Sequence, residues 1–163
     1  PTTDHGVPPD QIADFLICNR DTFNPRWTWD RMIRETGAWH EALANAEIDR
    51  VNDGSYDAEV DYGAFPDEMS VGGFDFHALR SLRALIVEGK GMHHCVASYY
   101  KDIRAGRCRI YSVRQGGKRV ATAEVSATTN PTPRIAQLKG MCNAAPAKAV
   151  REAAAKFAKV CIA

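Results

Sequence analysis

The sequence predicts an α+β fold in which N-terminal helices precede a small antiparallel β-meander that is flanked by helices. Two patterns carry this prediction. Near the N-terminus apolar residues recur every three or four positions, which is typical of amphipathic helices. After residue 106 the apolar period changes to two, which is typical of strands. A length of 163 residues with 45% hydrophobic and 25% charged residues indicates one compact globular domain.

Two helices are expected in the first 50 residues. The first begins with Asp10 as its N-cap and ends near Asn19. The second begins after Thr28, and its apolar residues continue at helical spacing as far as Leu43. The following segment, 52–73, is acidic, rich in glycine and aperiodic, so we expect a long loop there.

The second half of the chain predicts the meander. Residues 74–79 alternate like a short strand, and the helical turn after them is interrupted by Gly89 and Gly91. A helix then begins at His94 or Cys95 and ends at Gly106. We therefore divide the domain into an acidic helical segment, 1–73, and a basic α+β core, 74–163. Further strands are expected at 107–114, 119–126 and 134–139, and Pro146 opens a final helix.

Charge is distributed unevenly along the chain. Residues 1–88 hold 7 Lys and Arg against 17 Asp and Glu, whereas residues 89–163 hold 14 against 3, although the total net charge is only +1. Either the acidic half packs on the basic half, or the basic half contacts an anion such as nucleic acid. The cations expected to contact phosphates are Arg107, Arg109, Lys118, Arg119, Lys148 and Arg151.

Several classes of protein are excluded by absent patterns. No apolar run approaches the roughly 18 residues of a membrane helix, and the start PTTDHGVPPD lacks the features of a signal peptide. We therefore expect a cytoplasmic protein without a membrane partner. The five cysteines form no CxxC pair, and neither a P-loop nor GxGxxG or GxSxG occurs. We expect no metal, no cofactor and no disulfide framework.

The densest group of reactive side chains lies at 92–100. A thiol at a helix start beside an imidazole favours the thiolate, so Cys95 is a candidate nucleophile with His94 next to it. The alternative is that Cys95 is a core residue at the start of a helix. No histidine follows His94, so a catalytic base must be one of His93, His94, His77 and His40.

A second group of polar residues could complete a pocket. Glu124 lies in a strand whose alternation places Thr122 on the same face, and it is either an ion-pair partner of Arg114 or a general acid or base. Tyr99 lies one helical turn after Cys95. The predicted site has Cys95, His94 and Glu124 as catalytic residues and Tyr99, Arg114, Gln137 and Asn143 as substrate-binding residues.

These motifs also carry a family resemblance. The strings EGKGMHHCVASYYKDIRAGRCRIYSVR, ATAEV and AQLKGMCNAAP resemble the PcfJ-like family, which is named for a component encoded on conjugative plasmids. The resemblance covers about residues 74–159 and implies a protein of plasmids, phages or other mobile elements, without a settled activity. A small residue, Ala123, stands where the family pattern has a bulkier aliphatic one. The pattern falls on Glu88, Gly89, His94, Cys95, Val96, Tyr99, Gly106, Arg114, Thr122, Glu124, Gln137, Gly140 and Asn143.

Three hypotheses of function follow. The first, favoured by the charge of the second half, is an accessory protein of a mobile element that associates with nucleic acid. The second is a small cysteine-dependent transferase or hydrolase with a Cys95, Glu124 and Arg114 pocket. The third is a domain that binds or inhibits another protein, in which the acidic half neutralises the basic half.

Overall fold

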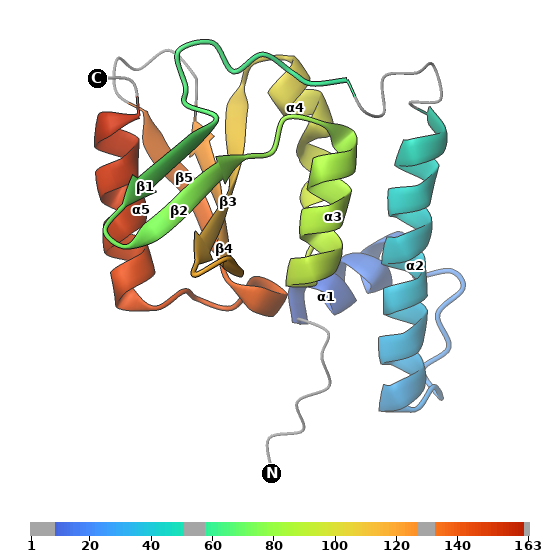
Figure 1. Cartoon of the computed structure of the whole chain (residues 1–163). Helices are drawn as coiled ribbons and strands as arrows, with labels where there is room; N and C mark the ends of the chain where they lie inside the picture. Colours follow the sequence, from blue (N-terminus) through green and yellow to red (C-terminus); the bar gives the residue numbers. More distant parts are fainter. Residues whose placement is uncertain (1–8, 51–57, 127–132, 162–163) are drawn as a thin grey trace.

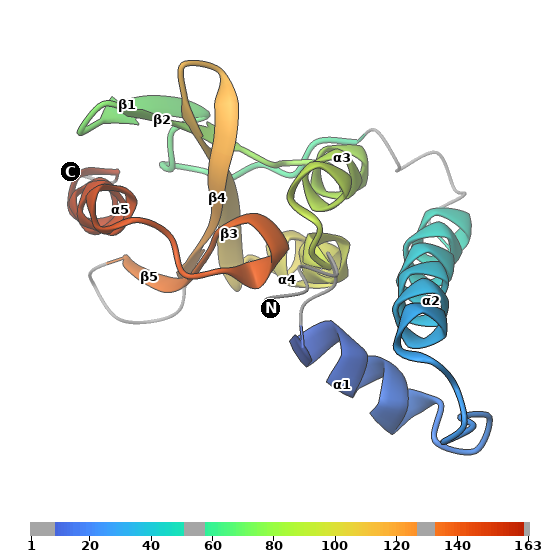
Figure 2. The same ribbon diagram turned by 90° about the horizontal axis from the view of Figure 1, so that it is seen from below.

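The computed structural model describes residues 9–50, 58–126 and 133–161. Its centre is a five-stranded antiparallel sheet with the strand order β1-β2-β3-β4-β5, so each strand pairs with its neighbours along the chain. Helix α5 packs on one face of the sheet, and α3 and α4 lie toward the other, with the pair α1 and α2 beyond them (Figures 1 and 2). The predicted α+β fold, with helices before a meander, is confirmed.

The elements have the following bounds. The strands are β1 Glu68–Val71, β2 Phe74–Ala78, β3 Cys108–Gln115, β4 Lys118–Ser126 and β5 Arg134–Lys139. The α-helices are α1 Pro9–Cys18, α2 Trp29–Arg50, α3 Leu82–Met92, α4 Tyr100–Arg104 and α5 Lys148–Val160. Two 3₁₀ helices, η1 Val96–Tyr99 and η2 Met141–Asn143, complete the described part of the chain.

The strands after residue 106 agree with the alternating pattern, whereas β1 lies inside the expected loop. It pairs with β2 through a turn in which Gly72 and Gly73 have φ values of 62° and 82°, a conformation that favours glycine. Because β1 is an edge strand that alternates only between exposed and half-buried residues, its apolar signal is weak. The sheet therefore begins at Glu68, before the boundary expected at residues 73 and 74.

The helices required three corrections. Helix α1 begins at Pro9, so Asp10 is its second residue and not its N-cap. Helix α3 continues through both glycines and ends at Met92, where His93 takes the left-handed conformation with φ 55°. That reversal divides the helix expected from His94 to Gly106 into η1 and α4. The prediction for α2 is confirmed, since Thr28 Oγ1 accepts a 3.3 Å hydrogen bond from the Arg31 amide.

Two hydrophobic cores pack the helices and strands together. In the main core the rings of Phe76 and Phe157 stack with centroids 4.2 Å apart, which fixes α5 on the sheet. A smaller core around Phe15 and Met32 joins α1 to α2. None of the described helices is long and apolar enough to span a membrane.

Candidate functional site: a thiol–imidazole pair beside a polar pocket

A buried carboxylate organises the junction of α3 and the sheet. Glu88 of α3 is fully buried, and its Oε2 accepts a 2.7 Å hydrogen bond from Arg119 Nε of β4. Its Oε1 accepts a 2.9 Å hydrogen bond from the Thr122 hydroxyl. A buried charge is tolerated only when it is paired and hydrogen-bonded, and Glu88 meets both conditions. Arg119, one of the cations expected to contact phosphate, thus forms an ion pair within the protein.

His94 extends this network into a pocket. Its Nε2 lies 2.9 Å from Thr122 Oγ1, and because the Thr122 hydroxyl donates to Glu88, the proton of this contact belongs to the imidazole. Burial lowers the pKa of His94 below its ordinary value, although the Glu88 carboxylate opposes the shift. His94 is therefore held as the neutral ring with the proton on Nε2.

The backbone at His94 packs so closely on α3 that a glycine is required at position 89. A Cβ at Gly89 would lie 2.7 Å from the His94 carbonyl oxygen, which is closer than atoms in proteins approach. The His94 amide donates a 3.1 Å hydrogen bond to the Gly89 carbonyl oxygen. The Glu-Gly pair at the end of α3 thus supplies the buried charge and the close approach that together position His94.

Cys95 contacts a histidine of a distant element. Its Sγ lies 2.8 Å from Nδ1 of His40 in α2. The other ring nitrogen of His40, Nε2, lies 3.2 Å from the Gln11 carbonyl oxygen of α1. A carbonyl oxygen only accepts, so Nε2 carries the hydrogen and Nδ1 presents its lone pair to the thiol. Of the four histidines proposed as bases, the structure places His40 against the thiol, whereas His94 contacts Thr122.

The exposed thiol stands at the start of a 3₁₀ helix of four residues, not in the first turn of an α-helix. The helix-dipole argument that favoured a thiolate at Cys95 is therefore wrong in its structural premise. The contact with His40 supplies an independent reason for reactivity, because a base within hydrogen-bond distance accepts the thiol proton directly.

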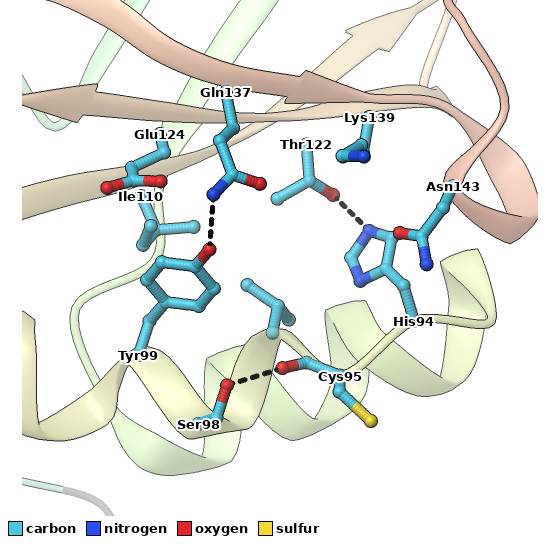
Figure 3. A pocket seen from close by; sticks show the side chains of 11 residues that line it. His94, Cys95, Ser98, Tyr99, Ile110, Thr122, Glu124, Gln137, Lys139 and Asn143 are labelled. Carbon is cyan, nitrogen blue, oxygen red and sulfur yellow. Dashed lines mark hydrogen bonds between the residues drawn. The ribbon is translucent and has the colours of Figure 1, made fainter. Parts of the chain in front are cut away.

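A cavity of about 250 Å³, the polar pocket, opens between η1 and strands β4 and β5 (Figure 3). Gln137 Nε2 donates a 2.9 Å hydrogen bond to the Tyr99 hydroxyl oxygen. Burial raises the pKa of Glu124 above its ordinary value, and a hydrogen bond with Tyr99 partly opposes this. The pocket is lined by His94, Cys95, Val96, Ser98, Tyr99, Ile110, Thr122, Glu124, Gln137, Lys139 and Asn143.

A second cavity of about 380 Å³, the helix cleft, includes residues of α2 and α3 such as Gly37 and Ile86. His40 lines it, and both His94 and Cys95 line this cleft as well as the polar pocket. Figure 3 shows that the sulfur of Cys95 points away from the end of the polar pocket where Glu124 lies. The thiol thus stands at the boundary between two cavities and is directed to His40.

Six of the seven residues predicted to form a catalytic and substrate-binding site line the polar pocket: Cys95, His94, Glu124, Tyr99, Gln137 and Asn143. Arg114 lies elsewhere, opposite Asp75 and Arg119 in the sheet, and its Nε donates a 3.2 Å hydrogen bond to Ser112 Oγ. Glu124 stands opposite Ile110 in the register and bonds Tyr99 instead of Arg114. The Cys95, Glu124 and Arg114 pocket is therefore not assembled as such.

Sequence reasoning missed Lys139 and gave no ground for choosing His40 among the histidines. The alternation of the strand puts Thr122 on the same face as Glu124 but does not predict its contacts with Glu88 and His94. The alternation of β5 carries a signal for Lys139, since it shares a strand face with Gln137. No local signal exists for His40, because its contact with Cys95 spans 55 residues.

The six cations expected to contact nucleic acid are spread over several elements, and most have partners within the chain. Arg107 Nη2 lies 2.6 Å from the exposed carboxylate of Asp102, and the Arg109 guanidinium lies 4.9 Å from the Tyr62 ring centroid. Arg151 donates to the Pro146 carbonyl oxygen, and Lys148 pairs with Glu152. Exposed cations nevertheless follow one side of α5, a surface we call the α5 stripe: Lys148, Arg151, Lys156 and Lys159.

Within residues 9–50, 58–126 and 133–161, no group of three or more His, Cys, Asp or Glu side chains could hold a metal ion. The fold and the site together define an α+β meander protein with a thiol–imidazole pair beside a polar pocket. The PcfJ-like protein family matches residues 30–155, from α2 into α5, and the chain belongs to this family. No curated protein and no solved structure shows a significant match.

Proposed function

We propose that this protein is a thiol-dependent acyl-transfer enzyme, a hydrolase or transferase, in which Cys95 is the nucleophile and His40 the base. The observation that carries the proposal is the 2.8 Å contact between Cys95 Sγ and His40 Nδ1. It is supported by the 3.2 Å contact that directs His40 Nε2 to the Gln11 carbonyl. A nucleophile, a base and a group that orients the base are the three parts that thiol catalysis requires.

The reaction follows from these positions. His40 Nδ1 accepts the proton of Cys95, and the thiolate attacks the carbonyl carbon of an ester, thioester or amide. The sulfur–carbon bond forms, the bond to the leaving group breaks, and the His40 imidazolium donates its proton to that group. Water or an acceptor amine then attacks the thioester and gives a proton to Nδ1, and the departing Cys95 thiolate recovers a proton from the imidazolium.

The two cavities beside Cys95 provide space for the two sides of a scissile bond. The helix cleft borders His40, and the polar pocket presents hydroxyl and amide groups such as Tyr99 and Gln137. Holding the reacting carbonyl next to the nucleophile lowers the barrier, because the entropy of bringing the two groups together is lost on binding. In this proposal Glu124 and its neighbours bind substrate and do not touch the sulfur.

The test is the trapping of an acyl-enzyme. The protein is treated with p-nitrophenyl acetate, and peptide mass spectrometry locates the acetyl group. We expect acetylation at Cys95, its loss in Cys95→Ser and a strong decrease in His40→Ala. Cys18 is the matched control, since it is the other exposed cysteine among the described residues. Acetylation of Cys18 at the rate of Cys95, or a His40→Ala variant that reacts like the wild type, would refute the proposal.

Nucleic-acid association is a second candidate function, in the service of a plasmid or phage as the family resemblance implies. The α5 stripe favours it, because four exposed cations lie on one side of the helix, with the exposed carboxylate of Glu152 among them. Phosphate contacts of this kind are independent of base sequence and weaken with salt.

A further inference from the structure

The polar pocket contains two opposite charges that do not neutralise each other. Glu124 and Lys139 are both half-buried and both line the pocket. Within the described part of the chain no ion pair reaches either residue, and Glu124 has a hydrogen bond only with Tyr99. Half-buried charges that lack an ion-pair partner are costly in a folded protein, so a pocket that keeps two of them calls for an explanation.

The sheet register shows where the two charges lie relative to each other. Lys139 lies opposite Thr122, and Glu124 lies opposite Gln137, so the two charged residues are diagonal neighbours on one face of strands β4 and β5. Diagonal positions are roughly 7–8 Å apart, so the two side chains are not held directly against each other as an opposite pair would be. Figure 3 shows Glu124 and Lys139 at opposite ends of the pocket, with Gln137 and Thr122 between them.

The groups between the two charges are neutral hydrogen-bonding side chains. Gln137 is held against Tyr99 by the 2.9 Å hydrogen bond, and the Thr122 hydroxyl is held between Glu88 and His94. Because these partners already fix their orientation, binding a ligand costs little side-chain entropy. Burial also raises the pKa of Glu124, which a bound cation would reverse.

We propose that the polar pocket binds a zwitterionic ligand of the α-amino-acid type, with its ammonium group on Glu124 and its carboxylate on Lys139. A cavity of about 250 Å³ accommodates such a molecule. Each charge of the ligand satisfies one charge of the protein, and the amide and hydroxyl groups contact its side chain. As a substrate of Cys95 the ligand must carry its ester, thioester or amide on the side chain, and this role rests on the proposed function. Binding of the ligand requires no reaction at the thiol.

Binding is tested with the free L-amino acids as probes, first by thermal shift and then by calorimetry, on the wild type and on Cys95→Ser. We expect at least one amino acid to bind saturably and with equal affinity to both proteins. Its N-acetylated form, which lacks the ammonium, and its amide, which lacks the carboxylate, should each bind at least about tenfold more weakly.

Two variants test whether Glu124 and Lys139 bind the two charges of the ligand. Glu124→Gln and Lys139→Gln should each weaken binding at least about tenfold. Lys118→Gln is the matched control, because Lys118 is exposed at the turn end of β4, outside the pocket. Circular dichroism confirms that each variant is folded, and if Glu124→Gln is not, Lys139→Gln decides alone.

The inference is overturned if no amino acid binds at about 10 mM, which is about tenfold above the Kd of roughly 1 mM that marks a weak ligand. It is also overturned if the blocked derivatives bind as well as the free amino acid, or if Lys139→Gln leaves the affinity unchanged. Acetylation of Cys95 without amino-acid binding would leave the thiol reaction standing and remove this substrate class. Binding without acetylation would leave the ligand site standing and remove the thiol reaction.

Discussion

His40 and Cys95 are 55 residues apart in the sequence, yet the ring of one and the sulfur of the other are 2.8 Å apart. His40 belongs to the N-terminal helix pair, and Cys95 to the segment that leads from α3 into η1. A second contact joins the same two parts, since the Gln11 side chain donates a 3.1 Å hydrogen bond to the His93 carbonyl oxygen. Docking of the helix pair therefore completes the thiol–imidazole pair.

Reactivity of the thiols should follow this geometry. Iodoacetamide should label Cys95 faster than the exposed Cys18, and His40→Ala should remove the difference. The buried cysteines should react slowest, because burial raises the pKa of Cys108 to about 12 and also raises the pKa of Cys161. Peptide mass spectrometry over a pH series measures the four rates. Equal labelling of Cys95 and Cys18 in the wild type would contradict the prediction.

Gly89 should tolerate no larger residue. In Gly89→Ala the added Cβ meets the His94 carbonyl oxygen at 2.7 Å, so we expect a loss of about 1–3 kcal/mol in the free energy of unfolding. Gly37 in α2 is the matched control, since a Cβ there meets nothing within 4 Å. Gly37→Ala should stabilise the protein by roughly 0.5–1 kcal/mol. Denaturant unfolding measures both, and changes of the same sign would show that the close approach does not constrain α3.

Stability should fall as the pH decreases from 7 to 5, and His94 should contribute to this fall. Its pKa is lowered in the folded protein by burial, so the unfolded chain binds the proton more readily and protonation favours unfolding. The contribution is complete above the ordinary histidine pKa of about 6.5 and is lost as the pH falls through the folded value.

Glu124 has the opposite effect on the pH dependence of stability. Its pKa is raised in the folded protein, so the folded state binds the proton more readily than the unfolded chain. Melting temperatures over this pH range should therefore decrease less in His94→Asn than in the wild type. Parallel pH profiles for the two proteins would contradict the assignment to His94.

Nucleic-acid binding, if the α5 stripe carries it, should depend on salt. Each phosphate neutralised contributes about −0.9 to the slope of log affinity against log salt for duplex DNA and about −0.7 for single strands. Neutralising Lys148, Arg151 and Lys156 together should flatten the slope by about two to three units. Neutralising Arg107, which pairs with Asp102, should change it less. Fluorescence anisotropy measures the slopes, and absence of binding at about 50 mM salt would favour the hypothesis of a protein-interaction domain.

Local patterns determined most of the sheet and several of the pocket residues. Alternation along β4 places Thr122 and Glu124 on one face because successive side chains of a strand point to opposite sides. The positions of β3 and β4 and the boundaries of β5 were predicted from the same alternation. These features depend on backbone geometry and on residues close in the sequence, so the sequence alone determines them.

Only the tertiary structure decided how distant groups meet. Edge strand β1 has little apolar alternation, and α3 continues through two glycines because packing against η1 and β4 outweighs their low helix propensity. The choice of His40 as the partner of Cys95 depends on where α2 docks on the sheet domain. The exclusion of Arg114 from the pocket and the diagonal placement of Glu124 and Lys139 depend on strand register. Each is a long-range relationship, and no pattern of neighbouring residues encodes it.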